Sequence, residues 1–201
     1  VNQLNEYKKI LSNYSLKVIS LQGITYSEDN RFNNKLLKDE CLWEEHFENV
    51  LEIMKFLNCD IAVLGAPKLR KEIKYKNHFL QIYKKTYRKF LSYEKYILLE
   101  AVPSFYGCNI FNKLEELSEL CTKYNFLKHV DIGCFFNEQE IKFDNKNIYF
   151  ILKEIEHAFH LHISNQNLHT DAIEKNLKYL CSKFKNLNTE NIIFENISQS
   201  N

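Results

Sequence analysis

The chain has 201 residues, which is enough for one domain with a substantial core. Its 27 basic and 26 acidic residues nearly cancel, to a formal charge of +1, which argues against general nucleic-acid binding and against attachment to an anionic membrane surface. No stretch approaches the roughly eighteen uninterrupted apolar residues of a transmembrane helix, so no membrane-spanning segment is predicted.

The start of the chain and its cysteines indicate a compartment. The first residues, Val1 to Glu6, lack the charged-then-apolar pattern of a signal peptide. The six cysteines show neither a CxxC pair nor zinc-ribbon spacing, and Cys59 and Cys121 lie inside predicted core segments. Buried free thiols are typical of a reducing compartment, so a cytoplasmic protein is predicted.

Short apolar runs rich in β-branched residues alternate along the chain with longer amphipathic stretches. After a helical pattern in the first fifteen residues, six runs are predicted to be buried strands: residues 17–21, 60–64, 96–99, 127–130, 157–163 and 191–194. Between them, residues 42–57 and 114–124 carry apolar side chains at helical spacing. This alternation predicts βαβ units and a parallel sheet.

The number of strands defines the expected architecture. A closed (β/α)8 barrel has eight strands and usually about 250 residues. This chain offers six strands and begins with Val1 rather than Met. We therefore expect an α/β fold of the (β/α)8 TIM-barrel type that lacks the first two βα units, with residues 1–201 forming a single, N-terminally incomplete domain.

The rarest residues gather at the exits of the predicted strands. Glycine and proline mark sharp exits, and in parallel α/β folds these exits lie at the carboxyl ends of the strands, where active sites are built. All four glycines and both prolines follow closely on a predicted strand: Gly23, Gly65, Pro67, Pro103, Gly107 and Gly133.

Acidic and histidine residues accompany these exits. Glu100, Asp131 and Glu195 end the third, fourth and sixth strands, and His160 and His162 share one face of the fifth. Two glutamates, one aspartate and one or two histidines would converge at one barrel mouth. Such a set suits an octahedral divalent metal such as Mn²⁺, Mg²⁺ or Co²⁺, and it supplies the paired carboxylates that acid–base chemistry on a sugar requires.

Each of these residues also has a structural interpretation. An acidic residue after a strand is often a helix cap, and a histidine in a strand is often a hydrogen-bonded core residue. The shared position of the acidic residues relative to their strands favours a functional site.

The order Glu100, Asp131, His162 and Glu195 on consecutive strands resembles the xylose isomerase-like barrels, and within them the ketose 3-epimerases of the tagatose and psicose (allulose) type. The resemblance runs from the third to the eighth strand of that barrel. It implies that these four residues hold one divalent metal, Mn²⁺, Mg²⁺ or Co²⁺, with His162 as the histidine ligand. It also implies an isomerase or epimerase of carbohydrate metabolism.

Four short motifs give a narrower resemblance, to a bacterial branch of sugar phosphate isomerases/epimerases. They are Ser-Leu-Gln-Gly at 20–23, Gly-Ala-Pro-Lys-Leu-Arg at 65–70, Tyr-Gly-Cys at 106–108 and His-Leu-His-Ile-Ser at 160–164. The chain also departs from the ketose 3-epimerase pattern. Cys134 stands where those enzymes have a substrate-binding histidine, Tyr106 stands where they have a glutamate, and Asn165 and Leu168 replace the polar pair after the ligand histidine.

Candidate substrate contacts follow from these positions: Gln22, Lys68, Arg70, Tyr106, His160 and Asn165. Two cations at a strand exit can hold a phosphate or carboxylate. Alternatively, Lys68 and Arg70 begin a solvated basic segment, residues 68–89. The aromatic residues spread through that segment form either a partner surface or, at helical spacing, the core face of a helix.

The function predicted from these residues is metal-dependent isomerisation or epimerisation of a sugar or sugar phosphate through an enediolate. Glu100 and Glu195 are the catalytic pair, one removing the proton beside the carbonyl and the other returning one. Two alternatives stay open: a non-catalytic barrel that binds a sugar or phosphate, and an abasic-site endonuclease-like enzyme, against which Cys134 and the neutral charge count. The expected partner is a small molecule, without nucleic acid or membrane, and a homo-oligomer is left open.

Overall fold

The computed structural model describes residues 2–27, 32, 35–132, 145–164 and 192–195. All six predicted strands are present in one sheet, and its order is the order of the chain. Every neighbouring pair of strands is parallel, which confirms the predicted parallel sheet. The strands are β1 (Ser20–Leu21), β2 (Ile61–Leu64), β3 (Tyr96–Glu100), β4 (Lys128–Asp131), β5 (His160–Ser164) and β6 (Ile192–Glu195).

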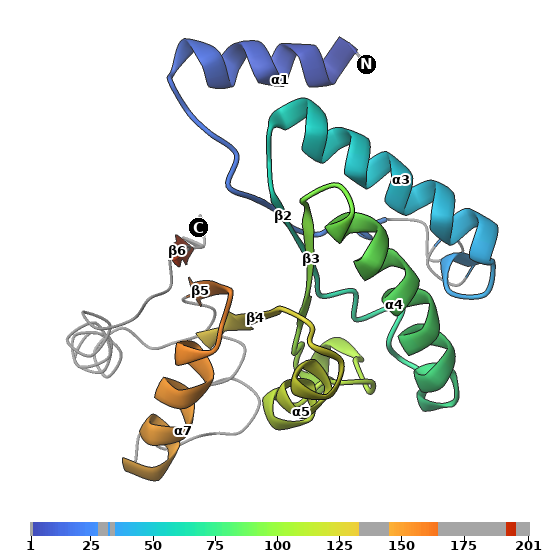
Figure 1. Cartoon of the computed structure of the whole chain (residues 1–201), viewed down its shortest axis with the longest axis vertical. Coiled ribbons are helices and arrows are strands. Elements are labelled where there is room, and N and C mark those ends of the chain that lie inside the picture. Colours follow the sequence, from blue (N-terminus) through green and yellow to red (C-terminus); the bar gives the residue numbers. More distant parts are fainter. Residues whose placement is uncertain (1, 28–31, 33–34, 133–144, 165–191, 196–201) are drawn as a thin grey trace.

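Helices cover the outside of this curled sheet. Figure 1 shows α3, α4, α5 and α7 following one another around the strands, so the described residues form an open part of a (β/α)8 barrel with six of its eight strands. The helices are α1 (Asn2–Asn13), α3 (Glu40–Leu57), α4 (Lys76–Leu91), α5 (Leu114–Tyr124) and α7 (Asn145–Glu156), with 3-10 turns η1 (Ile73–Tyr75) and η2 (Ser104–Tyr106).

Local sequence sets where two of these helices begin and end. The Asp39 carboxylate accepts a hydrogen bond of 3.1 Å from the backbone N–H of Leu42, which caps the start of α3. Asn58 and Asn125 end α3 and α5 in the left-handed conformation, with φ of 52° and 54°. Asparagine adopts this conformation more readily than most residues, so both helices stop shortly before the strand that follows.

The main core lies between the outer face of the sheet and the helices. Alternate residues of β2 and β3 point outward into this core, where they meet the buried aromatic side chains of α3 and α4. The indole N–H of Trp43 in α3 donates to the hydroxyl oxygen of Thr86 in α4, 2.7 Å away, and so ties the two helices together. The outward residues of the two strands are Ala62, Leu64, Ile97 and Leu99.

The inner face of the same strands carries a smaller apolar cluster. Ile61, Val63 and Leu98 pack together there, at the amino-terminal end of the barrel interior. Because strand residues alternate between faces, Glu100 shares the inner face with Leu98. The interior therefore changes from apolar to polar toward the carboxyl ends of the strands.

The basic segment at residues 68–89 has a structural role in this fold. The α4 aromatics Phe79, Tyr83, Tyr87 and Phe90 are buried against the sheet, which confirms the core-face interpretation. On the other side of α4, Lys85 forms an ion pair of 2.6 Å with Glu40 of α3, and Lys89 pairs with Glu48.

None of the described helices is long and apolar enough to cross a membrane. The four described cysteines are all free thiols: Cys59, Cys108 and Cys121 are buried and Cys41 is exposed. A cytoplasmic location and a single domain over residues 1–201 stay predictions.

Candidate metal centre

The polar residues of the barrel interior lie in rows set by strand register. Glu100 of β3 pairs with His129 of β4, which in turn pairs with His160 of β5. Two residues further along these strands, Asp131 pairs with His162. Paired residues of neighbouring parallel strands share a face, so all five occupy the inner face near the carboxyl ends of the strands.

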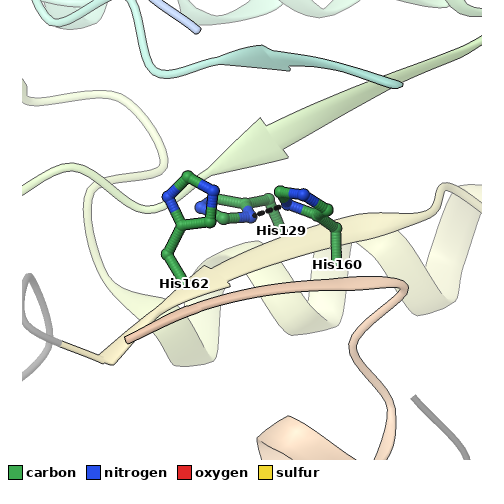
Figure 2. A group of neighbouring side chains, drawn as sticks. All are labelled: His129, His160 and His162. Carbon is green, nitrogen blue, oxygen red and sulfur yellow. Dashed lines mark hydrogen bonds between the residues drawn. The ribbon is translucent and has the colours of Figure 1, made fainter. Parts of the chain in front are cut away.

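Three histidines form a compact cluster in these rows. His129, His160 and His162 are 1%, 0% and 2% exposed, and each offers a ring nitrogen within 4.8 Å of the other two. Figure 2 shows the three rings gathered over β4 and β5, with the Nδ1 atoms of His129 and His160 hydrogen-bonded at 2.9 Å. The Nε2 atoms of these two rings are buried without a hydrogen-bond partner among the described residues.

Burial determines the protonation of this cluster. It lowers the pKa of His162 and of His160 to about 4, with His162 adding to the effect on His160. It lowers the pKa of His129 well below the ordinary value, and the neighbouring His162 and His160 add to that shift. The rings are therefore neutral at pH 7, and each has one unprotonated nitrogen, the form that can bind a metal.

Gln22 connects this cluster to the first strand. It follows β1 directly, and its side-chain amide nitrogen lies 2.7 Å from Nδ1 and 2.6 Å from Nε2 of His162. The amide can donate to whichever ring nitrogen is unprotonated. A residue 140 positions away in the chain thus orients His162 from across the barrel interior.

A glycine makes room for the Glu100 carboxylate. Gly65 follows β2, and a Cβ atom added to it would lie 2.6 Å from Oε2 of Glu100 and 3.3 Å from Cγ2 of Val102. The first distance is too short for any side chain to coexist with this carboxylate position. The absence of a side chain at Gly65 therefore lets Glu100 extend over the exit of β2.

Arg70 holds the backbone of the same region. Its fully buried guanidinium donates to the carbonyl oxygens of Gly65 and Glu100, the latter at 2.8 Å. It also donates to the carbonyl oxygens of Ile110 and Phe111, at 3.3 Å each. One side chain thus ties the exits of β2 and β3 to the loop before α5.

No family model and no curated protein sequence matches the chain. Solved structures, in contrast, are similar to the chain. A family 2 AP endonuclease from Brucella melitensis has a TM-score of 0.68 and 11% identity over 95% of this chain and 76% of its own, and a 3-keto-D-glucoside 4-epimerase from E. coli has a TM-score of 0.68 and 14% identity over 99% of this chain and 80% of its own. A D-allulose 3-epimerase from Methylomonas sp. in complex with D-allulose has a TM-score of 0.66 and 16% identity over 98% of this chain and 69% of its own. The chain has the xylose isomerase-like TIM-barrel fold. At these identities the likeness establishes the fold alone.

Within this xylose isomerase-like barrel, the predicted metal ligands occupy consecutive strands. Glu100 ends β3, Asp131 ends β4 and His162 lies in β5, all on the inner face. Glu195 ends β6, where its backbone pairs with Ser164, and its side chain lies outside the described part of the chain. The fold thus brings three predicted ligands to one face, and their binding of a metal stays a prediction.

The predicted substrate contacts divide into two groups. Gln22 and His160 lie at the histidine cluster. Lys68 is exposed and donates to the carbonyl oxygen of Ser27 at 3.3 Å, whereas Tyr106 lies in η2 and is 46% exposed. The Arg70 guanidinium is occupied by backbone carbonyls, as described above. Asn165 lies outside the described residues, as do Cys134 and Leu168.

Sequence reasoning missed His129 as a site residue. It was included only as part of a strand, although it precedes Asp131 by two positions and so shares the inner face with it. The same alternation rule that pairs His160 with His162 would have identified it.

Proposed function

We propose that this protein is a metal-dependent isomerase or epimerase that acts on a sugar or sugar phosphate through an enediolate. The observation that carries the proposal is the placement of Glu100, Asp131 and His162 on the inner face, at the carboxyl ends of consecutive strands of a xylose isomerase-like barrel. Active sites of TIM barrels are built at this end. The solved structures of the same fold include a 3-keto-D-glucoside 4-epimerase and a D-allulose 3-epimerase.

The described residues fit a divalent cation. Glu100 and Asp131 offer carboxylate oxygens, His162 offers a neutral imidazole, and Glu195 would complete the set. Gly65 leaves the space that the Glu100 carboxylate needs. Such mixed donors suit Mn²⁺, Co²⁺ or Mg²⁺. When bound, the ion would act as a Lewis acid that stabilises the negative charge of the enediolate.

Glu100 and Glu195 would move the protons. One carboxylate takes the proton from the carbon beside the carbonyl, the C–H electron pair forms the C=C bond, and the carbonyl oxygen takes the negative charge. A carboxyl group then returns a proton. Return to the opposite face of the same carbon re-forms the original carbonyl and gives the epimer. Return to the former carbonyl carbon, with the proton of the neighbouring hydroxyl passing to the former carbonyl oxygen, gives the isomer. Lys68 and Tyr106, both exposed after strand exits, remain candidates to hold the substrate.

Deuterium wash-in tests this proposal directly. The protein, loaded with Mn²⁺ or Co²⁺ in heavy water, is offered a panel of ketoses, aldoses and their phosphates, and exchange is read by mass spectrometry. Glu100→Gln and Glu195→Gln should each lower the exchange rate by about 10²–10⁴-fold, the typical effect of losing a general base. Glu52→Gln, on the exposed face of α3, is the matched control and should exchange at the wild-type rate. Absence of exchange across the panel would contradict the proposal.

A second candidate function is supported by the histidine-rich interior. The Brucella AP endonuclease has the same fold, and the three buried histidines of this chain offer more nitrogen ligands than the single predicted ligand His162. Cleavage of a duplex oligonucleotide with one abasic site, without proton exchange on any sugar, would favour this candidate. Tight binding of a sugar without exchange or cleavage would instead indicate a non-catalytic binding barrel.

A further inference from the structure

We propose that His129, His160 and His162 bind a zinc-class divalent ion through three ring nitrogens, on the inner face of β4 and β5. This ion site shares His162 with the carboxylate set described above, but it rests on none of the proposed proton-transfer steps. It makes the nitrogen donors of the barrel interior, rather than its carboxylates, the main determinant of which metal the protein prefers.

The spacing of the ring nitrogens suits a small ion. Two ligands each about 2.05 Å from a tetrahedral ion lie about 3.3 Å apart. The Nδ1 atoms of His129 and His160 are 2.9 Å apart and face each other. The His162 ring lies 4.4 Å from the His129 ring and 4.8 Å from the His160 ring, between centroids. Small rotations of the side chains would bring three nitrogens to a common centre.

The hydrogen bond between His129 and His160 does not account for the burial of both rings. Buried side-chain nitrogens in folded proteins normally have a partner. Here the Nδ1 atoms of His129 and His160 face each other, while both Nε2 atoms have no partner among the described residues. Two facing Nδ1 atoms can share one proton or one cation. A cation, unlike a proton, would also bind a nitrogen of His162, whose ring lies against both others.

The donor chemistry selects the class of ion. Imidazole nitrogens suit Zn²⁺, Co²⁺, Ni²⁺ and Cu²⁺, whereas Mg²⁺ and Ca²⁺ prefer oxygen ligands. Three histidines leave the fourth position of a tetrahedral zinc ion open, as in catalytic zinc sites. Glu100 and Asp131 pair in register with His129 and His162, which places two carboxylate-bearing residues on the same face as the three rings.

Zinc titration of the chelator-treated full chain tests the inference. Wild type should bind one Zn²⁺ per chain in competition with a chromophoric chelator, and excess Mg²⁺ should not displace it. His129→Gln and His160→Gln should each weaken binding by at least about 100-fold, because loss of even an outer-shell partner costs 10–100-fold. His157→Gln is the matched control, since His157 is exposed before β5 and outside the cluster. Zinc affinity equal to wild type in both cluster variants would overturn the inference.

Nuclear magnetic resonance of the wild-type chain tests the same site without relying on the folding of any variant. With ¹⁵N-labelled histidine, zinc should change the ring-nitrogen shifts of three of the seven histidines. Unchanged shifts, or changes confined to other histidines, would overturn the inference. The two proposals fail separately: absence of proton exchange across the panel would contradict the reaction and leave zinc binding intact, whereas wild-type zinc affinity in both histidine variants would overturn the ion site and leave the wash-in result to decide the reaction.

Discussion

The two faces of β2 and β3 differ in what they contribute: the outer face packs against the helices, and the inner face carries the candidate site. Outward residues of these strands, such as Leu64 and Leu99, pack under the aromatic side chains of α3 and α4. Inward positions include Ile61, Val63 and Leu98 and end with Glu100, which lies in register with the buried histidines. A shift of one residue separates the two environments, because strand side chains alternate. The outer face holds the fold together, and the inner face carries polar groups whose burial costs stability.

The largest expected effect lies on the outer face. Phe79→Ala removes a fully buried ring of α4. This ring packs edge-on to Trp43, with 6.2 Å between the two ring centroids. Such truncations cost about 3–5 kcal/mol of unfolding free energy. Urea denaturation measures the loss, with Phe105→Ala as the control, because that ring is 56% exposed and its loss should cost little. Equal losses for both variants would show that the outer core is not where stability resides.

How far the sequence predicts this molecule also differs between the two faces. The strands follow from local apolar runs, and the buried face of α4 follows from aromatic residues at helical spacing, so the outer layer was predictable. The register of the strands was not predictable, because no local sequence pattern pairs Glu100 with His129 or His129 with His160. From the sequence, Arg70 is either a cation that holds a phosphate or carboxylate or the start of a solvated basic segment, whereas the carbonyl oxygens that its buried guanidinium contacts belong to residues up to 41 positions away.

Arg70 connects the two faces, and its removal should have the next largest effect. Arg70→Met keeps the length of the side chain but leaves buried carbonyl oxygens without their donors, which include those of Gly65 and Glu100. Each unsatisfied buried group costs about 1–3 kcal/mol, so the low end of that range for the four carbonyl oxygens gives a loss of about 4 kcal/mol. Arg88→Met, on the exposed side of α4, should stay within about 0.5 kcal/mol of wild type in the same urea assay. Matching stabilities for the two variants would contradict this role.

Acid should destabilise the inner face of the metal-free protein. The pKa of His160 and of His162 is about 4 in the folded chain, against an ordinary value of 6.5, so the unfolded chain binds more protons between these two values. Stability is therefore complete above pH 6.5 and falls as the pH drops toward 4. One pKa unit of difference corresponds to about 1.4 kcal/mol of stability, so the effect is large enough to measure.

Thermal unfolding of chelator-treated protein across this pH range measures the effect. His160→Gln removes one titrating ring and should flatten the dependence between pH 6.5 and 4, whereas His157→Gln should retain the wild-type slope. A wild-type stability that does not change over this range would mean that the rings are not held neutral by burial.

The smallest effect on stability comes from Gly65→Ala, and it sharpens the comparison most. Gly65 has no left-handed backbone, so an added methyl group meets only the movable end of Glu100, at 2.6 Å, and Val102. We expect a loss of less than about 1 kcal/mol, because the carboxylate can swing away.

Gly107→Ala is the opposite case. The φ of Gly107 is +82° and nothing lies within 4 Å of an added Cβ, so backbone strain of about 1–2 kcal/mol arises without any contact at the site. If Glu100 serves as ligand and base, Gly65→Ala should lower proton exchange by tenfold or more at nearly wild-type stability, and Gly107→Ala should lower stability at wild-type exchange. Urea denaturation and deuterium wash-in on the same two preparations separate the outcomes. Unchanged exchange in Gly65→Ala would show that the position of the Glu100 carboxylate over the β2 exit has no part in the reaction.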